Sequence, residues 1–431
     1  MESMVLKMRK MKDSGIEWIG EIPEEWEVVK AKYLFAQRNE KGNSALVLLS
    51  PTQKYGVIPQ SQLEGVVQVK ENTDLRTFKT IHIGDFVISL RSFQGGFEFS
   101  NYEGICSPAY QVFHATKDLS NDFFRYLFKS DGFISKINSL TIGIREGKNI
   151  QYWDFSNMLL ALPPKEVQIR SAQYLNVKCT EIDTILSKTR SSIEEYKKLK
   201  QAVITQAVTK GVRGEREMKD SGVEWIGEIP KEWGRTKIKM IASFFNGDRT
   251  SRYPQPSDFV DAGVAFLTSR NIDSDEVDLS ETKYITDDKY KSLSGAKIQI
   301  DDIIFCLRGS VGKCAINRTL SCGTVASSLA TIRPKDIYPK YLLYFLLSNI
   351  ASTQTTIFMN GTCAANLSAE NVGNYYLTLP ISTEQKEIAD YLDAKCAEID
   401  KLIAKKEQLV KEMESYKKSL IYEVVTGKRE V

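Results

Sequence analysis

The sequence repeats itself at two places, and this repetition constrains the fold more than any other feature. Residues 11–30 read MKDSGIEWIGEIPEEWEVVK, and residues 218–237 read MKDSGVEWIGEIPKEWGRTK, with 15 of the 20 positions identical. A second pair reads LPPKEVQIRSAQYLNVKCTEID at 162–183 and LPISTEQKEIADYLDAKCAEID at 379–400. The stretches between the repeats have diverged. A duplicated frame around two unlike inserts predicts a protein that recognises two different targets at a fixed separation.

The two repeats have different offsets, and these define the expected organisation. Trp18 corresponds to Trp225, 207 residues later, whereas Pro163 corresponds to Pro380, 217 residues later, so the second insert is about ten residues longer. We expect four segments, namely two variable domains and two helical regions. Their boundaries are 11–160, 161–217, 218–378 and 379–431.

Two long helices are predicted at 165–210 and 383–427. Each carries a heptad seam of about four repeats, and the seams match at the 217-residue shift. The seam residues are Ile182, Leu186, Thr189, Ile193, Tyr196, Lys200, Val203 and Ala207, and then Ile399, Ile403, Lys406, Val410, Met413, Lys417, Leu420 and Val424. At the polar steps Lys200 and Lys417, the neighbours Leu199 and Tyr416 are apolar alternatives.

Signals at both helix ends, and the amphipathic pattern between them, predict how the two helices pack. Each helix follows a proline and ends near a glycine, Gly211 or Gly427. Residues 182–209 would span roughly 42 Å as a helix. Neither amphipathic helix is expected to be stable alone, so an antiparallel pair is predicted. The order of the parts further predicts a ring cut open, with adjacent termini and a pseudo-twofold axis through the pair.

The inserts are predicted to be compact α/β domains, which makes the fold class α+β. Strand patterns occur at 84–91 and 301–308, and helical runs follow at 122–130 and 338–349. The order strand, strand, helix does not fit a doubly wound sheet.

Composition is that of an ordinary globular chain. The 431 residues are 42% hydrophobic and 26% charged, and no run approaches 18 apolar residues, so we expect a cytoplasmic protein with no membrane partner. A net charge of +3 is weaker than a typical nucleic-acid binder carries, so any DNA-binding surface depends on local clustering. The seven cysteines include no CxxC pair; Cys306, Cys314 and Cys322 are interpreted as buried small side chains, and Cys179 and Cys396 as packing residues at matching repeat positions.

Catalytic motifs are mostly missing. His82 and His114 are the two histidines and have no metal-ligand spacing, and GSVGK at 309–313 departs from the phosphate-loop pattern. A nuclease-like set of Asp131, Glu146 and Lys148 has no counterpart in the second insert. The sequence therefore predicts a chain with no catalytic or metal site.

Binding residues are better represented. Arg91 and Arg308 follow matching strands and precede glycines, and arginine suits guanine edges or phosphates. Pairing with the nearby carboxylates Asp85 or Asp302 is an equally open interpretation of these arginines. The candidate DNA-binding residues are Arg91, Gln94, Arg145, Lys148, Asn149, Tyr152, Arg249, Arg252, Arg270, Asn271, Arg308 and Lys313.

The positions of the repeated tryptophans favour a role in packing over a role in contacting bases. Trp18, Trp26, Trp225 and Trp233 occupy matching positions and are possible stacking platforms for bases. A protein that reads two different targets should vary at its reading positions, and these positions do not vary. We therefore expect scaffold packing or partner docking.

Three stretches together resemble the specificity subunit of type I restriction-modification systems. They are MKDSGIEWIGEIPEEWEVVK, LRSFQGGFEFSNYEGICSPAY at 90–110 and LPISTEQKEIADYLDAKCAEID. The resemblance covers nearly the whole chain, twice over. The first helix departs from it, because LPPKEVQIRSAQYL lacks the Glu-Gln-Lys-x-Ile-Ala core of TEQKEIADYL, so docking there is expected to differ in detail.

The resemblance implies target-recognition domains at 11–160 and 218–378, each reading half of a split DNA site. It implies an antiparallel coiled coil that sets the gap between them and docks two methyltransferase subunits, with two restriction subunits in the full complex. S-adenosylmethionine, ATP and Mg are then expected on those partners, and no cofactor in this chain. The residues expected to form the coiled coil and dock partners are Ile182, Leu186, Ile193, Tyr196, Val203, Ile399, Ile403, Val410, Met413 and Leu420.

Physical dimensions agree with this function. Adjacent major-groove approaches on one face of DNA lie about 34 Å apart, so a spacer of about 42 Å is of the right order. The leading hypothesis is a non-catalytic subunit that recognises a bipartite DNA site and directs adenine methylation or restriction by its partners. The alternative is a coiled-coil scaffold that joins two protein-binding domains without nucleic acid.

Overall fold

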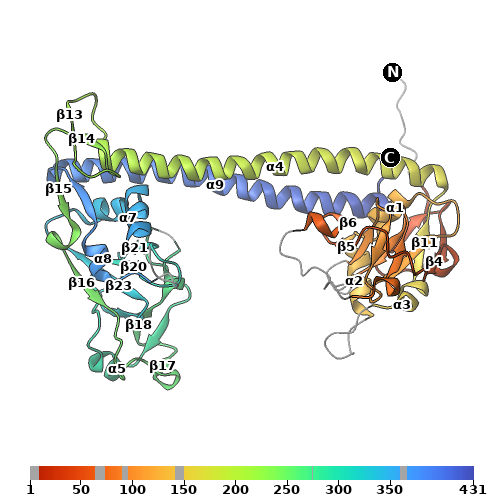
Figure 1. Cartoon of the computed structure of the whole chain (residues 1–431), viewed down its shortest axis with the longest axis horizontal. Coiled ribbons are helices and arrows are strands. Elements are labelled where there is room, and N and C mark those ends of the chain that lie inside the picture. Colours follow the sequence, from red (N-terminus) through yellow and green to blue (C-terminus); the bar gives the residue numbers. More distant parts are fainter. Residues whose placement is uncertain (1–8, 64–72, 90–95, 141–149, 274, 360–365) are drawn as a thin grey trace. The chain divides into compact units, whose positions relative to one another are not determined.

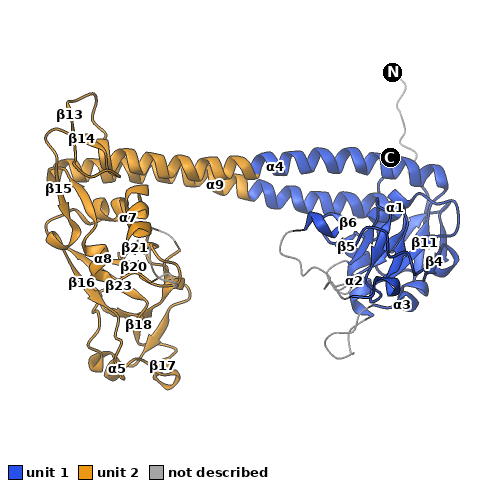
Figure 2. Cartoon of the chain, in the orientation of Figure 1, with its two compact units in different colours: residues 1–189, 408–431 blue, residues 190–407 orange. Residues whose placement is uncertain are grey.

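A computed structural model describes residues 9–63, 73–89, 96–140, 150–273, 275–359 and 366–431 (Figure 1). The chain divides into two compact units, which Figure 2 colours separately. Unit 1 comprises residues 1–189 and 408–431, and unit 2 comprises residues 190–407. Helices and antiparallel sheets are combined in both units, which confirms the α+β class.

Unit 1 is built around a four-stranded antiparallel sheet of order β4-β11-β8-β9, with small two-stranded sheets beside it. The central strands are β4 (Phe35–Arg38), β8 (Phe86–Ile88), β9 (Phe97–Phe99) and β11 (Gln111–Ala115). The smaller sheets pair β1 (Met11–Asp13) with β2 (Glu21–Pro23), β3 (Glu27–Lys30) with β12 (Leu159–Leu162), β5 (Leu49–Thr52) with β6 (Gly56–Pro59), and β7 (Lys79–Ile81) with β10 (Gly104–Cys106). The short helices are α1 (Asn121–Leu127), α2 (Asp131–Ser139) and α3 (Tyr152–Ser156).

Phenylalanines fill the core between this sheet and its three helices. Phe86 and Phe113 stack with ring centroids 5.4 Å apart, and Phe35 meets Phe124 edge-on at 5.1 Å. The fully buried members are Phe35, Phe86, Phe97, Phe113, Phe123, Phe124, Phe128, Phe133 and Phe155. Since truncating a buried phenylalanine to alanine typically destabilises a domain by about 3–5 kcal/mol, this cluster fixes the sheet against the helices.

Unit 2 repeats the same frame and adds a second sheet. The repeated strands are β13 (Met218–Asp220) with β14 (Glu228–Pro230), β15 (Gly234–Lys237) with β24 (Tyr376–Leu379), and the sheet β16 (Ala242–Asn246), β23 (Leu329–Pro334), β20 (Ile303–Cys306) and β21 (Cys314–Ile316). The added sheet contains β17 (Phe259–Val260), β19 (Lys283–Ile285), β18 (Val264–Leu267) and β22 (Gly323–Val325). The helices are α5 (Asp287–Ser292), α6 (Pro339–Leu347), α7 (Asn349–Met359) and α8 (Ala369–Gly373).

Two long helices, α4 (Lys165–Lys210) and α9 (Ser382–Val425), run through both units and confirm the two predicted helical segments. In unit 2, Lys200 Nζ contacts Asp400 Oδ2 at 2.8 Å, and Arg213, just beyond α4, contacts Glu387. Residue numbers therefore increase along α4 while they decrease along the facing part of α9. The helices are therefore antiparallel there. Every predicted seam residue is buried or half-buried. The suggested alternatives at the polar steps were wrong, because Leu199 and Tyr416 are 48% and 44% exposed.

Helix ends follow the predicted stop signals. Gly211 and Gly427 have φ of +78° and +74°, in the left-handed region that glycine adopts without a Cβ clash. Beyond Gly427, Lys428 Nζ donates to the Ile19 carbonyl at 2.8 Å, and Tyr422 Oη donates to the Trp18 carbonyl at 3.1 Å. The end of α9 thus holds the segment between β1 and β2 within unit 1.

The repeated tryptophans serve packing, as expected. Trp26 and Trp233 are each 1% exposed, and Trp18 and Trp225 are partly buried against the cores of their own units. Among the described helices, none is long and apolar enough to cross a membrane.

Candidate nucleic-acid interface

Three loops of unit 2 meet around the turn that precedes β23. Ala326 N donates to the Leu267 carbonyl at 2.8 Å, and Leu307 N donates to the Ser328 carbonyl at 2.9 Å. Gly247 N donates to the carbonyl of Leu329 at 3.3 Å. The segments that follow β16, β18 and β20 are thereby drawn to one end of the unit. We call residues 247–253, 268–273 and 307–313 the loop cluster.

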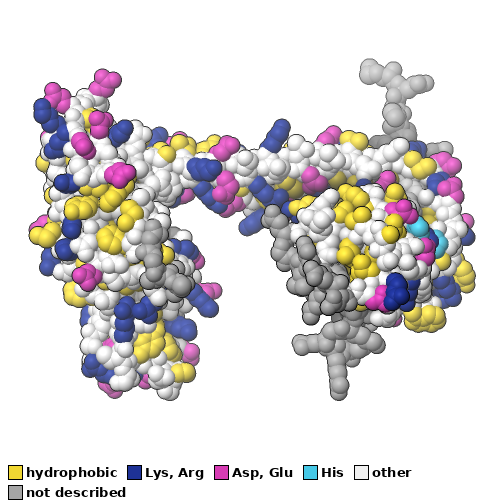
Figure 3. Space-filling view, in the orientation of Figure 1, with side chains coloured by type: hydrophobic (Ala, Val, Ile, Leu, Met, Phe, Trp, Pro, Cys, Tyr) yellow, Lys and Arg dark blue, Asp and Glu magenta, His cyan; other side chains and the backbone are white. Residues whose placement is uncertain are grey.

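The loop cluster exposes five of the basic residues that were predicted to bind DNA. Two of the loops are joined directly, because Lys313 Nζ contacts Asp273 Oδ1 at 2.7 Å. Figure 3 shows Lys and Arg side chains over the part of unit 2 that carries β17, β18 and α5. The exposed cluster residues are Arg249, Arg252, Arg270, Arg308 and Lys313.

A buried carboxylate fixes the first loop. Asp248 is 4% exposed and accepts hydrogen bonds from Thr250 N at 2.8 Å and from Ser294 N at 2.8 Å, and both hydroxyls also donate to it. The Thr250 hydroxyl and the other donors hold the pKa of Asp248 well below its usual range. Because the carboxylate ties the loop to the neighbouring turn, Arg249 is presented from a rigid backbone. Asp248 was not among the predicted site residues, although Asp-x-Thr is an Asx-type turn signal.

Close backbone approach in this loop requires glycine. A Cβ at Gly247 would lie 2.2 Å from the Ala326 carbonyl oxygen, and one at Gly295 would lie 2.4 Å from Asp248 N. Substitution at either glycine would push the loop away from its neighbours. Two glycines thus add to the rigidity that Asp248 provides.

Two predicted DNA-binding residues point inward. Asn271 is 1% exposed, and its amide nitrogen donates to the Asp278 carbonyl at 2.8 Å while its oxygen accepts from Thr268 N at 2.8 Å. Tyr152 Oη donates to the Phe35 carbonyl at 2.7 Å, and burial raises the pKa of its hydroxyl. Both side chains hold the backbone in this structure, which differs from the predicted reading role.

Arg308 is not held by the carboxylate considered as its alternative partner. Asp302 is 1% exposed and binds Arg333 through two hydrogen bonds of 2.8 Å. Arg308 is exposed, and its backbone pairs with Asn366. The pairing of Arg308 with Asp302 is therefore wrong, and this arginine is presented at the surface.

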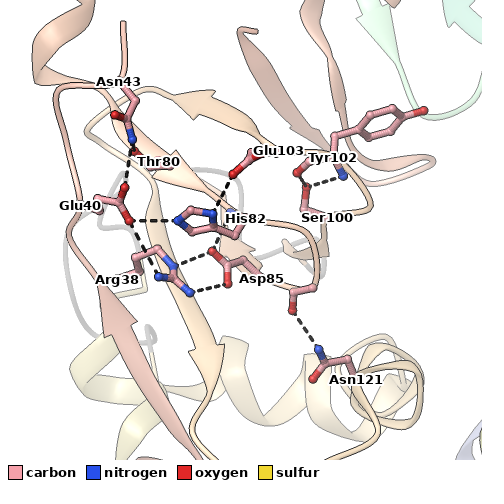
Figure 4. A network of polar contacts seen from close by, with 11 residues as sticks. Arg38, Glu40, Asn43, Thr80, His82, Asp85, Ser100, Tyr102, Glu103 and Asn121 are labelled. Carbon is pink, nitrogen blue, oxygen red and sulfur yellow. Dashed lines mark hydrogen bonds and ion pairs between the residues drawn. The ribbon is translucent and has the colours of Figure 1, made fainter. Parts of the chain in front are cut away.

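Unit 1 neutralises the matching carboxylate from a different strand. Asp85 corresponds to Asp302 and is bound by Arg38 of β4 at 2.8 Å (Figure 4). In unit 2, the arginine that binds Asp302 is Arg333, which lies on β23. His114 occupies the place in unit 1 that Arg333 holds in unit 2, as the strand registers show. Burial, together with the charge of Arg38, lowers the pKa of His114.

A histidine bridges two glutamates next to this pair. The His82 Nε2 lies 2.9 Å from Glu40 Oε2, and Nδ1 lies 3.0 Å from Glu103 Oε1 (Figure 4). The contact with Glu40 chiefly raises the pKa of His82, and the same contact lowers the pKa of Glu40. Within the described residues, no group of three or more His, Cys, Asp or Glu side chains is placed to hold a metal ion.

The remaining candidates belong to unit 1 and lie outside the described residues. Ser89 N donates to the Gly96 carbonyl at 2.7 Å after β8, as Cys306 N donates to the Lys313 carbonyl at 2.8 Å at the end of β20 in unit 2. The described residues on either side of the two loops are therefore equivalent in the two units. The candidates outside the described residues are Arg91, Gln94, Arg145, Lys148 and Asn149.

Both long helices expose apolar side chains at matching positions. Ile185 and Leu402 are 44% and 36% exposed and are related by the 217-residue shift, as are the exposed Leu199 and Tyr416. Leu409 is 38% exposed. We call these five residues the outer stripe; Ile185, Leu409 and Tyr416 belong to unit 1, and Leu199 and Leu402 belong to unit 2.

Residues 230–412 match the family model of the type I restriction modification DNA specificity domain. The chain is 23% identical over 423 residues to the type I restriction enzyme MjaVIII specificity subunit of Methanocaldococcus jannaschii, covering 94% of this chain and 93% of that protein. It is 26% identical over 265 residues to the EcoBI specificity subunit of Escherichia coli, covering 60% of this chain and 55% of that protein.

Solved structures share the fold. A chain from a structure on complex assembly and conformational transition of the type I R-M system matches with a TM-score of 0.72 at 16% identity, over 95% of this chain and 99% of that one. The HsdS subunit from Thermoanaerobacter tengcongensis matches with a TM-score of 0.51 at 16% identity, over 95% and 98% of the two chains. Residues 230–412 thus match the type I restriction modification DNA specificity domain, and the chain as a whole is similar to the specificity subunits of type I restriction enzymes.

Proposed function

We propose that this chain recognises a bipartite DNA site, with unit 1 reading one half and unit 2 the other. The observation that carries the proposal is a frame kept in both units, with different side chains at equivalent loop ends. In unit 2 the loop cluster exposes four arginines and a lysine from anchored backbone. Arginine and lysine bind phosphates and guanine edges, so such a surface both positions a protein on DNA and reads it.

We further propose that two methyltransferase subunits bind the paired helices and that two restriction subunits join the full complex. The outer stripe supports this, because it offers a similar apolar position on each helix at the 217-residue shift. S-adenosylmethionine, ATP and Mg would then act on those partners, which carry out adenine methylation and restriction. The role of this chain is to place them on the DNA.

Selection from a random duplex library tests the recognition function. The full chain, purified with its modification subunits, is incubated with the library at moderate salt, and the bound fraction is sequenced. We expect enrichment of one split motif with a fixed gap. No enrichment over random duplex would refute DNA recognition and leave a scaffold that joins two protein-binding domains.

A charge-matched control makes the selection sharper. The variant Arg308→Ala removes an exposed cluster residue, whereas Arg318→Ala removes an arginine that contacts Asp301 at the other end of the same sheet. Only the first should weaken binding to the enriched motif. Equal weakening by both would indicate a general effect of charge rather than a defined reading surface.

A further inference from the structure

Three glutamines of unit 1 form a row that none of the candidate sites includes. Gln37 Nε2 donates to Gln111 Oε1 at 2.5 Å, and Gln111 Nε2 lies 3.5 Å from Gln151 Oε1. Gln37 belongs to the edge strand β4, Gln111 begins β11, and Gln151 is the N-cap of α3. We call these three residues the glutamine row. Their amides are linked to one another across three separate elements, and the Gln151 side chain also accepts a hydrogen bond from the Asp154 backbone in the capping box of α3.

The backbone beneath the glutamine row is fixed. Gln37 pairs with Phe113 in the β4–β11 register, so its side chain emerges on the face that carries the phenylalanine core. Tyr152, next to Gln151, donates to the Phe35 carbonyl at 2.7 Å and ties α3 to β4. The row therefore lies over the end of a packed core. Gln37 and Gln151 are exposed, and Gln111 is half-buried.

The row lies at the end of the sheet that corresponds to the loop cluster. In unit 2 that end is formed by the C-terminal ends of β16 and β20 and by the N-terminal end of β23. Gln37 lies near the C-terminal end of β4, and Gln111 lies at the N-terminal end of β11. Strand β11 pairs with β8 in unit 1 as β23 pairs with β20 in unit 2. Amides and basic loops thus occupy equivalent ends of the two units.

Unit 2 keeps the frame at these positions but not the amides. The register places Phe244 where unit 1 has Gln37, because Phe244 pairs with Ile332 as Gln37 pairs with Phe113. Ala330 stands at the place of Gln111. Ser368, the N-cap of α8, stands at the place of Gln151, the N-cap of α3. Positions that differ at equivalent backbone sites are those expected to separate two specificities.

We propose that the glutamine row reads an A·T base pair in the DNA half-site bound by unit 1, an inference that rests on the proposed DNA recognition. A carboxamide donates to adenine N7 and accepts from adenine N6, which is the pairing that a glutamine side chain makes in the major groove. Opening the row exchanges amide–amide hydrogen bonds for amide–base hydrogen bonds of the same kind. The swap leaves no buried polar group unpaired.

The test compares the motif enriched by the unchanged protein with the motifs enriched by two variants. Gln111→Ala removes the central amide of the row. Gln299→Ala removes an exposed glutamine in the turn before β20, at the opposite end of the unit 2 sheet, and is the control. All three proteins are purified with their modification subunits, and folding is checked by hydrogen exchange of the β4 and β11 amides.

We expect Gln111→Ala to lose preference at one A·T position of one half-site by roughly 10- to 100-fold. The other half-site and the gap should stay unchanged, and Gln299→Ala should enrich the original motif. An unchanged motif for a folded Gln111→Ala protein overturns the proposal, and so does weaker binding without altered preference.

Gln37→Ala provides a second test in case Gln111→Ala does not fold, since Gln37 is exposed at the sheet edge. The same loss at the same base pair supports the row, and full retention overturns it. If the unchanged protein enriches no motif at all, the failure belongs to the proposed function rather than to the glutamine row.

Discussion

The indole nitrogen of Trp233 donates a hydrogen bond of 2.9 Å to the carboxylate of Glu384, which is 1% exposed. Arg216 also binds Glu384, at 2.6 Å, and its guanidinium lies over the Trp233 ring. Unit 1 has Val167 at the position of Glu384, and the indole nitrogen of Trp26 has no hydrogen-bond partner among the described residues. The departure seen in the first helical repeat thus removes a polar anchor between helix and hairpin.

We expect Glu384→Val to lower the free energy of unfolding of unit 2 by about 2–3 kcal/mol, because it leaves a buried indole donor unpaired and takes a carboxylate from Arg216. Glu387→Val is the matched control. Its exposed pair with Arg213 should contribute less than about 1 kcal/mol. Urea unfolding with hydrogen exchange of the β13–β14 amides measures both, and equal effects would contradict the anchor.

Arg38→Ala should destabilise unit 1 by about 3 kcal/mol, because Asp85 is left as a buried carboxylate without its cation. Adding His114→Arg places an arginine where unit 2 has Arg333, and should recover part of the loss. Hydrogen exchange of β8 and β11 reports both effects. Recovery by His114→Lys to the same extent would show that charge alone, rather than the two-pronged arginine contact, is what Asp85 requires.

The stability of unit 1 should depend on pH through His82. Its contact with Glu40 raises its pKa above the ordinary value of 6.5, so the folded state binds the proton more tightly than the unfolded state. The stabilisation is full below about pH 6.5 and is lost as pH rises through the raised pKa. The pKa of His114 is lowered, so His114 acts in the opposite direction and destabilises unit 1 as pH falls below its ordinary value of 6.5.

The variant His82→Gln, which carries the residue found at the equivalent Gln299, isolates this contribution. The difference in unfolding free energy between the unchanged protein and the variant should shrink between about pH 6 and 8. Because His114 is present in both proteins, its effect cancels except for the smallest contribution to its lowered pKa, which comes from the charge of His82. A difference that is constant across this interval would exclude protonation of His82 as the cause.

Matched ion pairs should set the register of the two helices. Lys417 contacts Asp183 at 2.7 Å in unit 1, and Lys200 contacts Asp400 at 2.8 Å in unit 2, each at the same step of the repeat. Reversing one charge in each pair, as Asp183→Lys with Asp400→Lys, should lower helix stability by about 1 kcal/mol per pair through like-charge repulsion. Circular dichroism at rising temperature measures the loss, and Lys200→Asp with Lys417→Asp should restore it.

Arg308→Ala should weaken binding to the enriched DNA motif by about 1–3 kcal/mol if the arginine reads a base edge. A phosphate contact would instead reduce the salt dependence of binding and leave base preference intact. Titrations at two salt concentrations separate these outcomes. Unchanged affinity at both concentrations would assign Arg308 a role in structure rather than in DNA binding.

The sequence predicted the features that depend on local or periodic patterns. The helix pair follows from a heptad spacing, and Gly211 and Gly427 end the helices because their left-handed backbone requires no Cβ. Packing of Trp26 and Trp233 followed from their equal placement in both repeats. Each of these signals lies within one segment of the chain or occurs in both copies of the sequence repeat.

Contacts between distant segments were not predictable in this way. Asp85 and Asp302 occupy the same place in the frame, yet their arginines come from β4 in one unit and from β23 in the other. Neighbouring strands in these sheets are far apart in sequence, so proximity along the chain pointed to Arg91 and Arg308 instead. Asn271 was misjudged for a related reason, because a polar side chain in a loop can serve its own backbone.

The assignment of residues 408–431 to unit 1 has a consequence for synthesis. A ribosome delivers the chain from the N-terminus, and most domains fold as they emerge. Unit 2 has all of its residues once position 407 is made, whereas the hairpin β1–β2 must wait for Tyr422 and Lys428. The first half of this protein is therefore completed last, and a nascent chain released early would lack the segment that closes unit 1.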